Sequence, residues 1–496
     1  MKLLLVNPNF KGVVSVPSLG LGFIGTYVRE NSNCEVEIVE PILQGLTEAQ
    51  VLDKVKESDI VGLTCYTESR FQVFDFAAKA KQVNPDCKLI VGGPHVNTLG
   101  KQILQHYPFI DVVVRGEGEE TTLDIIKGKA FEEVLGITWR KNSGDIVRNP
   151  DRPMIRNIDS LHYDYSLILP QVEGWKDLEI SPELQKLNAL PIIASRGCPF
   201  RCAFCAAHEQ WGKIYRGLSP EELVKRLKEL VNQYNIGYFR FYDALFTGND
   251  KKILRFCDLL EKSKLNIRFR IDVRVGTSRE VLKRLREVGC DIVGFGVETG
   301  SDKILKRINK GINRKQIEET IKICKELDYW IIGFFMISLP DETMEDIKRT
   351  LELLKFFDGI NLQFFKIHPN TSFYNELKQR GEIDDEVWLD PNYGVNTIYG
   401  NELYYCKNIF PSASFYRDEV EALLRRAYCN YTIHNPQKAI QRFGLVKGAL
   451  MLSMSATLYG LLKTKMGRKL YSKFQNTILP KMLYGWLSKK NRKVNT

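Results

Sequence analysis

The sequence predicts an α/β protein with two successive parallel sheets and a helical C-terminal region. Short, continuously apolar segments alternate with helical segments in residues 1–140, and the same alternation returns in residues 191–370. Strands that are apolar along their whole length are typical of parallel sheets covered by helices on both faces. Residues 141–190 lack this periodicity and contain several prolines, which predicts a linker between two domains.

The first series predicts five strands with helices between them. Glycine-rich turns follow two of these strands, at residues 92–93 and 116–118. Ligands of open parallel sheets bind outside the carboxyl ends of the strands, and these turns fall there. The predicted strands are residues 2–6, 35–39, 60–64, 88–91 and 112–114, and the clearest helices are residues 48–57 and 70–83.

The second series predicts six strand–helix units, which make a partial (βα)6 barrel or most of an eight-stranded one. Strands are expected at residues 191–195, 238–242, 268–273, 292–297, 331–337 and 362–367, with helices at 220–234, 279–288 and 313–327. Barrels of this kind carry their chemistry at the carboxyl ends of the strands. The polar residues at these ends are Arg196, Asp243, Asp272, Arg274, Glu298 and His368. Residues 371–496 are helical, aromatic and finally basic, and predict an appendage.

Composition narrows the classes of protein. The 496-residue chain has 71 Lys and Arg against 60 Asp and Glu, a net charge of +11. The excess lies in the C-terminal tail, so binding to nucleic acid is not expected. Eleven cysteines and an N-terminal apolar stretch too short for a signal peptide predict reduced thiols and a cytoplasmic protein. No stretch approaches the ~20 apolar residues of a membrane-spanning helix.

The segment SRGCPFRCAFCAAH carries the most specific motif. Cys198, Cys202 and Cys205 follow a predicted strand in a CxxxCxxC arrangement. Three thiolates on a short loop can hold three irons of a 4Fe–4S cluster and leave the fourth iron open. A structural zinc site remains an alternative, although such a site needs four protein ligands. His208 is near enough in sequence to be the fourth.

This motif, with the aromatic Phe204 before its last cysteine, resembles the radical S-adenosylmethionine (SAM) superfamily. The resemblance implies that the open iron chelates SAM and that the reduced cluster cleaves SAM to a 5′-deoxyadenosyl radical. The family places a polar motif after the second strand, where Asp243 in FRFYDALFTGN would hold the methionine amino group or act as a helix cap. Glu298, in VGFGVETGSDKILKRINKG, would accept hydrogen bonds from the ribose or serve as a helix-start acid. Arg274 would lie near the SAM carboxylate.

The front domain resembles the Rossmann-like cobalamin-binding domain of one radical SAM class, the class B-like methyltransferases. The matching segments are PSLGLGFIGTYV, IVGLTCYTES, IVGGPHVNT and VVRGEGEET, whose glycines allow backbone to approach a large corrin. The Asp-x-His-x-x-Gly motif of histidine-ligated cobalamin is absent, so Tyr66 is expected at the lower face of the cobalt. A nucleotide-fold domain without cofactor is the alternative. The residues that the resemblance assigns to cobalamin are Leu19, Gly20, Thr64, Tyr66, Gly92, Gly93, His95, Gly116, Glu117 and Gly118.

The combined resemblance implies an enzyme with a 4Fe–4S cluster, SAM and cobalamin. The favoured hypothesis is methylation of an unactivated carbon in an unidentified small molecule, lipid or peptide, with electrons from an external donor. Ring formation or rearrangement by the same cofactors, and a non-catalytic cluster-bearing sensor, remain alternatives. Residues 425–443 resemble the C-terminal part of radical SAM enzymes that act on tetrapyrroles or hopanoid-type lipids. The mixed apolar and basic residues that follow favour either peripheral membrane contact or a helix packed on the barrel.

Overall fold

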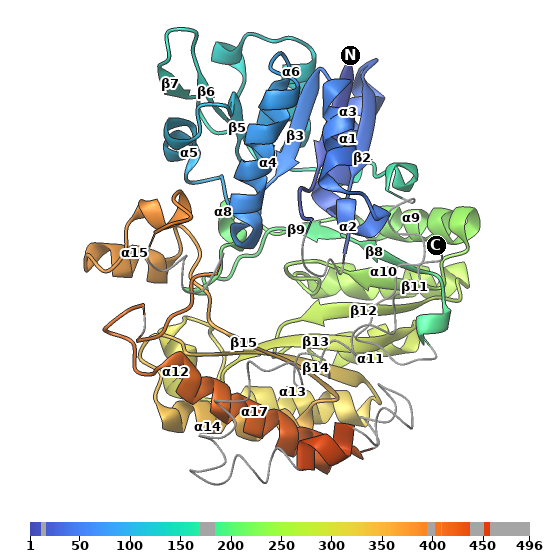
Figure 1. The fold of residues 1–496 in the computed structure, drawn as a ribbon. Helices are drawn as coiled ribbons and strands as arrows, with labels where there is room; N and C mark the ends of the chain where they lie inside the picture. Colours follow the sequence, from blue (N-terminus) through green and yellow to red (C-terminus); the bar gives the residue numbers. More distant parts are fainter. Residues whose placement is uncertain (11–15, 169–183, 394–401, 408, 437–450, 457–496) are drawn as a thin grey trace.

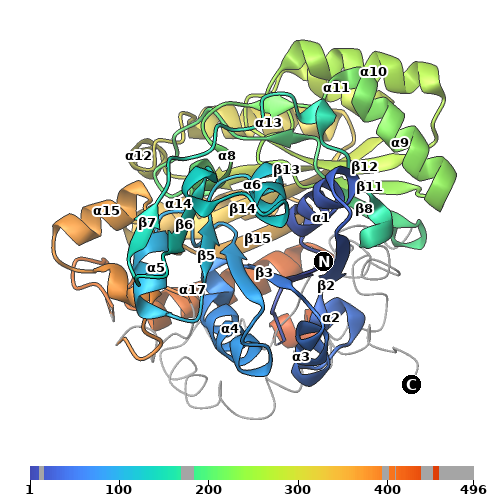
Figure 2. The same cartoon turned by 90° about the horizontal axis from the view of Figure 1, so that it is seen from above.

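The computed structural model describes residues 1–10, 16–168, 184–393, 402–407, 409–436 and 451–456. Two sheets dominate these residues: a seven-stranded N-terminal sheet and a six-stranded sheet in the middle of the chain. Figure 1 shows the N-terminal domain above the second sheet, with its strand β3 directed toward β9. Seen from above in Figure 2, strands of the N-terminal domain lie in front of β14 and β15.

The N-terminal sheet has the strand order β2-β1-β3-β4-β5-β6-β7. The first five strands pair in parallel and the last two pair antiparallel. The strands are β1 (Lys2–Val6), β2 (Glu35–Val39), β3 (Ile60–Thr64), β4 (Lys88–Gly92), β5 (Val112–Val114), β6 (Ile137–Arg140) and β7 (Ile146–Arg148), and the helices are α1 (Leu19–Asn31), α2 (Pro41–Gln44), α3 (Glu48–Lys56), α4 (Arg70–Val83), α5 (Gly100–His106) and α6 (Glu119–Ile126).

The prediction of a linker from residue 141 onward is wrong at its start. Strands β6 and β7 form a hairpin, so the N-terminal sheet extends to Arg148. The turn between them uses Gly144 at φ +92°, a backbone conformation that glycine adopts readily. The pattern ITWRKNSGDIVR carries the signal, because two short strand-forming segments flank a turn that contains glycine.

The second sheet is the predicted half-barrel of six parallel strands, in the order β15-β14-β13-β12-β11-β8. Its strands are β8 (Ala189–Ile192), β11 (Tyr238–Phe241), β12 (Arg268–Val273), β13 (Cys290–Glu298), β14 (Trp330–Ile337) and β15 (Gly359–Phe364). Strands β9 (Ser195–Arg196) and β10 (Arg216–Gly217) form a separate antiparallel pair. The accompanying helices are α8 (Ala207–Trp211), α9 (Pro220–Tyr234), α10 (Asp250–Ser263), α11 (Arg279–Glu287), α12 (Asp302–Arg307), α13 (Arg314–Glu326) and α14 (Met344–Leu353).

Helix α9 shows why the sequence folds in this way. Ser219 caps its first turn by accepting a hydrogen bond from the Glu222 amide, and Pro220 occupies the first position, where it loses no helical bond. Leu223, Leu227 and Leu230 recur at a four- and three-residue spacing and are buried against the core. The predicted bounds of this helix are confirmed.

Strand β15 begins three residues earlier than predicted and ends at Phe364. Beyond it, α15 (Ser372–Gln379) and α17 (Arg417–His434) confirm a helical C-terminal region. The Tyr431 hydroxyl fixes α17 to the barrel by donating toward the carbonyl oxygens of Phe357 and Asp358, each at 2.9 Å. The lysines and arginines of the predicted basic tail, which begin at Lys463, lie outside the described residues.

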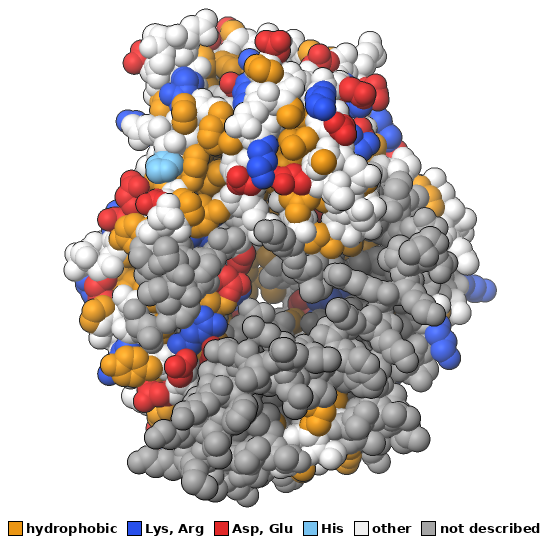
Figure 3. Space-filling view, in the orientation of Figure 1, with side chains coloured by type: hydrophobic (Ala, Val, Ile, Leu, Met, Phe, Trp, Pro, Cys, Tyr) orange, Lys and Arg blue, Asp and Glu red, His pale blue; other side chains and the backbone are white. Residues whose placement is uncertain are grey.

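The surface of the N-terminal domain carries both signs of charge. In Figure 3, basic and acidic side chains are interspersed over the visible face of this domain. Many of them pair, as Lys54 does with Glu37 at 2.6 Å. None of the helices in the described part of the chain combines the length and apolarity of a membrane span.

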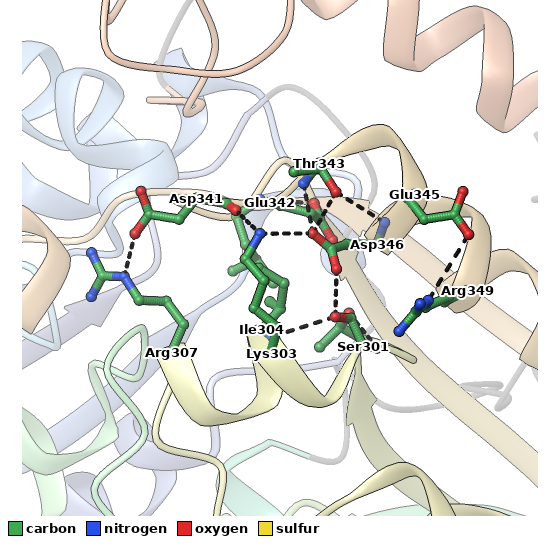
Figure 4. A network of polar contacts seen from close by, with 12 residues as sticks. Ser301, Lys303, Ile304, Arg307, Asp341, Glu342, Thr343, Glu345, Asp346 and Arg349 are labelled. Carbon is green, nitrogen blue, oxygen red and sulfur yellow. Dashed lines mark hydrogen bonds and ion pairs between the residues drawn. The ribbon is translucent and has the colours of Figure 1, made fainter.

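A polar network joins α12 to the start of α14 (Figure 4). Asp346 accepts hydrogen bonds from the hydroxyls of Ser301 and Thr343, each at 2.6 Å, and pairs with Lys303 at 3.0 Å. Burial alone would raise the pKa of Asp346, but these contacts hold it well below its usual range. Glu342 beside it is fully buried and accepts from the Leu339 amide at 3.1 Å, and burial raises its pKa to about 8.

The Glu342→Gln variant should gain stability relative to the natural protein as the pH rises. The folded chain keeps the Glu342 proton up to about pH 8, whereas the unfolded chain releases it near pH 4.5. The natural protein therefore loses up to about 5 kcal/mol of stability as the pH rises through this window. Glutamine does not titrate, and its oxygen can still accept from the Leu339 amide.

Thermal unfolding at about pH 5 and about pH 9 measures this effect. Glu345→Gln, on the exposed side of the same turn, is the matched control and should follow the natural protein at both pH values. A difference between Glu342→Gln and the natural protein that stays constant with pH would contradict the prediction.

Candidate active site

The three motif cysteines lie on the loop between β9 and α8, at the carboxyl end of the barrel. Their thiols are half-buried and form no disulfide. Gly197 precedes the loop at φ +80°, and a Cβ there would lie 2.1 Å from the Ile214 carbonyl oxygen, so only glycine allows this close approach. The Ala203 amide donates to the Ile308 carbonyl oxygen at 2.9 Å, which holds the loop against the end of α12.

Burial, helped by the neighbouring thiols of Cys202 and Cys198, raises the pKa of Cys205 to about 11 against the lowering effect of a hydrogen bond to the Ala207 backbone. Burial also raises the pKa of Cys202, while Lys310 and Arg274 oppose that rise. The loop therefore gathers three thiols beside two cations. A cation or a metal cluster is what stabilises such thiols as thiolates.

The zinc alternative is not supported. The His208 imidazole donates a hydrogen bond to the Cys198 carbonyl oxygen at 3.1 Å, so its Nε2 binds the backbone of the cysteine loop. Within the described residues, no group of three His, Cys, Asp or Glu side chains converges on a point where one ion would bind. A 4Fe–4S cluster does not require this convergence, because each thiolate binds a different iron.

Glu298 and Arg274 lie beside this loop. Glu298 ends β13 in a left-handed conformation, φ +66°, and pairs with Lys310 at 2.7 Å. Arg274 follows β12, stacks 3.5 Å above the ring of Phe200, and donates to the Lys310 carbonyl oxygen. These residues bring a buried carboxylate and two cations to the mouth of the barrel, the groups that a ribose and an amino-acid carboxylate would need.

Lys310 was missed in the sequence. It contacts both Glu298 and the face of Phe204, whose ring centre lies 5.7 Å from its ammonium nitrogen. A Cβ at Gly296 would come within 2.6 Å of the Glu298 carboxylate and 2.9 Å of the Lys310 ammonium, so this glycine makes room for the ion pair. Lys310 belongs to the segment INKG, which begins ten residues after Glu298. Only the fold shows that its side chain returns to the Glu298 carboxylate.

Asp243 follows β11 as predicted, but its carboxylate oxygens already accept hydrogen bonds from the segment that follows β8. It accepts from the Ala194 amide at 3.1 Å and from the Ser195 hydroxyl at 2.5 Å. Burial raises its pKa to about 7 against the effect of these bonds. The structure thus shows Asp243 holding the segment that leads into the cysteine loop. Its contact with the methionine amino group stays a prediction.

A cavity of about 510 Å³ lies between the carboxyl ends of the two sheets. The predicted cobalamin residues line this cavity, with one exception. They are Leu19, Gly20, Thr64, Tyr66, Gly92, Gly93, Gly116, Glu117 and Gly118.

His95 is the exception, and its assignment to the cofactor is corrected by its position. It is fully buried behind the cavity, with Nδ1 at 3.3 Å from the Thr67 hydroxyl and its ring edge-on to Trp388. Burial holds the pKa of His95 well below its usual value, so the ring is neutral. In the segment GGPHVN, the glycines therefore line the cavity and the histidine side chain is buried in the core.

The residues present fit a large corrin. A Cβ at Gly20 or Gly116 would meet nothing within 4 Å, so these glycines leave open space in the wall of the cavity. Gly93 has φ +101°, and a Cβ there would lie 2.8 Å from the backbone of Cys65. Three of the predicted loops thus present bare backbone to one space, as the close approach of a flat cofactor requires.

The barrel supplies the opposite wall of the cavity, through residues that the sequence did not assign to cobalamin. Part of it is α8, the helix that begins two residues after Cys205. The barrel residues that line the cavity are Ile193, Ala206, Ala207, Glu209, Gln210, Trp211, Tyr242, His368 and Pro369. The cysteine loop and the cavity therefore share one short helix.

Two family profiles match the chain. The Radical SAM superfamily matches residues 192–354, and the B12 binding domain matches residues 11–126. An uncharacterized methyltransferase of Pyrococcus horikoshii is 31% identical over 449 residues, which are 87% of this chain and 92% of that protein. The anaerobic magnesium-protoporphyrin IX monomethyl ester cyclase of Rubrivivax gelatinosus is 28% identical over 404 residues, 78% of this chain and 71% of the cyclase.

Solved structures show the same arrangement of domains. The cobalamin-dependent SAM radical enzyme OxsB, with aqua-cobalamin and SAM bound, gives a TM-score of 0.71 at 19% identity and covers 95% of this chain and 74% of its own. The radical SAM methyltransferase TsrM of Kitasatospora setae, with cobalamin and a 4Fe–4S cluster bound, gives a TM-score of 0.61 at 17% identity. The match covers 76% of this chain and 75% of the TsrM chain. At these identities the likeness establishes the fold.

A glycine-lined α/β domain facing a half-barrel with a three-cysteine loop defines an enzyme that combines a corrinoid with an iron–sulfur cluster. The chain belongs to the cobalamin-dependent radical SAM enzymes, a family that includes methyltransferases. Its cofactors are a 4Fe–4S cluster, SAM and cobalamin. The predicted fold class and cofactors are confirmed, and the cofactor-free front domain and the sensor are not supported.

Proposed function

We propose that this enzyme transfers a methyl group to an unactivated carbon of its substrate. The observation that carries the proposal is the shared helix α8, which follows the cysteine loop and forms a wall of the glycine-lined cavity. A carbon atom in this cavity would have access to both cofactors. When bound, the cluster supplies the electron that cleaves SAM to a radical, and cobalamin supplies the methyl group.

The residues of the chain hold and orient these groups. Cys198, Cys202 and Cys205 would bind three irons, and Glu298 would accept hydrogen bonds from the ribose hydroxyls of SAM. Arg274, already stacked on Phe200, would lie toward the SAM carboxylate. The walls of the cavity are largely apolar, and exclusion of water from such a site would protect a radical from side reactions.

Ring formation is the second candidate, and one observation favours it. The Rubrivivax cyclase is nearly as similar to this chain as the Pyrococcus methyltransferase is. A ring-forming enzyme would use the same cluster and the same barrel residues. It would release 5′-deoxyadenosine and would transfer no methyl group from SAM.

Labelled SAM distinguishes the two reactions. The reduced holoenzyme is incubated with SAM that carries a trideuterated methyl group and with an anaerobic metabolite extract from the source cells. Methyl transfer predicts a new product that contains the deuterated methyl. Turnover of an extract component to a product without deuterium, accompanied by 5′-deoxyadenosine, would contradict methyl transfer and support ring formation.

We also propose that the basic C-terminal tail contacts anionic membranes. The tail combines apolar residues with lysines and arginines, each of which contributes about 1 kcal/mol near an anionic surface at low salt. Full-length protein should float with anionic liposomes and release them at high salt, and a chain truncated at Gly444 should not float. Equal flotation of the two proteins would contradict the proposal and favour a helix packed on the barrel.

A further inference from the structure

A cluster of buried charges joins the two domains beside the cavity. Arg196 of β9 pairs with Glu117 at 2.8 Å and with Glu119 of α6 at 2.6 Å. Arg216 of β10 pairs with Glu117 at 2.8 Å. All four side chains are at most 6% exposed. The Arg196 guanidinium also lies between two aromatic rings, 4.7 Å from the centre of Phe23 on α1 and 4.9 Å from that of Trp211 on α8.

The two ends of this cluster belong to the two cofactor sites. Arg196 ends β9 and is separated from Cys198 by Gly197 alone, so it lies directly before the cysteine loop. Glu117 lies between Gly116 and Gly118 in the cavity wall. Glu117 was predicted to bind the cofactor, but both of its oxygens already accept hydrogen bonds from Arg216. The Glu117 carboxylate thus connects the glycine loop of residues 116–118 to Arg196, directly before the cysteine loop.

A second set of contacts connects the same loops at the other end of the motif. The Asn97 amide donates to the Gln210 side chain at 2.8 Å and to the Glu209 carbonyl oxygen at 3.0 Å. The Asn97 oxygen accepts from the Gly116 amide at 2.9 Å, and Gln210 donates to the Gly116 carbonyl oxygen at 3.1 Å. Helix α8 is thereby attached to the glycine loop of the front domain. The cysteine loop is held at both ends by cobalamin-side residues.

We propose that Arg196, Glu119 and Gln210 are positioning residues that couple cobalamin binding to SAM binding. Buried charges cannot separate without a large desolvation penalty. If cobalamin reduces the motion of the glycine loop of residues 116–118, these contacts therefore also reduce the motion of the cysteine loop. Coupling between two binding sites is reciprocal, so each cofactor raises the affinity of the other by the same factor. This inference needs both cofactors and holds for either reaction proposed above.

Anaerobic titration of SAM into cluster-containing protein, with and without hydroxocobalamin, measures the coupling without any turnover. In the natural protein, cobalamin should raise SAM affinity by about fivefold or more. Glu119→Gln keeps the shape of the side chain but removes its charge. It should reduce the ratio of SAM affinity with cobalamin to SAM affinity without cobalamin toward one. Glu120→Gln, the next residue on α6, pairs with Arg152 instead and should keep the full ratio.

Gln210→Ala provides a neutral test if Glu119→Gln does not fold, with the exposed Lys213→Ala as its control. Electron paramagnetic resonance of the reduced cluster gives a second measurement. Cobalamin should change the SAM-induced spectrum in the natural protein and in Lys213→Ala, but not in Gln210→Ala. A ratio of one in the natural protein, or a full ratio in Gln210→Ala or in folded Glu119→Gln, would overturn the inference.

Discussion

Replacing Cys198, Cys202 and Cys205 together by alanine should remove the iron and all cleavage of SAM. The natural protein, reconstituted without oxygen, should carry about four irons per chain. The three thiols share one loop and interact electrostatically, and the other eight cysteines of the chain are buried. The variant should therefore lack the three thiolates that hold the cluster.

Iron analysis and the yield of 5′-deoxyadenosine after reduction measure this loss. His208→Ala is an informative companion variant, because a zinc site would need this imidazole as its fourth ligand. In the structure the imidazole bonds only to the Cys198 carbonyl oxygen among the described groups, so His208→Ala should keep its iron. Unchanged iron in the triple variant would refute the cluster assignment.

Glu298→Ala should weaken SAM binding and reduce both SAM-derived products about ten- to a hundredfold. The carboxylate is 8% exposed, and removing a buried hydrogen-bonding carboxylate costs about 1–3 kcal/mol. The structure adds a second effect, because the variant leaves the buried Lys310 ammonium without its carboxylate.

Glu298→Gln separates these effects from the loss of ribose binding. Because glutamine keeps an accepting oxygen near Lys310, this variant should retain the cluster while binding SAM more weakly than the natural protein. Glu280→Ala, on α11, is the control and should behave as the natural protein does. SAM affinity and iron content are measured together. Natural SAM affinity in iron-loaded Glu298→Ala would remove Glu298 from the SAM site.

The elements that sequence predicted most accurately are those with one dominant local signal. Strand β3 is buried at every position and its predicted bounds are confirmed, because an uninterrupted apolar segment has no other stable placement. Helix α9 combines a cap, an N-terminal proline and a regular apolar stripe, and is likewise confirmed. The β6–β7 hairpin has short, half-polar strands, and its turn signal was outweighed by the prolines that follow.

The site residues that could be predicted are likewise those with a local sequence signal. The cysteine motif and the glycine loops are local patterns, so their placement could be predicted from the chain alone. Lys310 and the pair of Glu117 with Arg196, 79 residues apart, depend on which elements the fold brings together. His95 shows the opposite case, where a local motif was correct but the side chain turns into the core.

The most direct test of the central claim is the pair of products that SAM leaves behind. A cobalamin-dependent radical methyltransferase consumes SAM in two roles, one polar and one radical. Reduced holoenzyme with its substrate should therefore release S-adenosylhomocysteine and 5′-deoxyadenosine in roughly equal amounts. Substrate turnover with 5′-deoxyadenosine but without S-adenosylhomocysteine would leave the fold and its cofactors in place and would contradict methyl transfer.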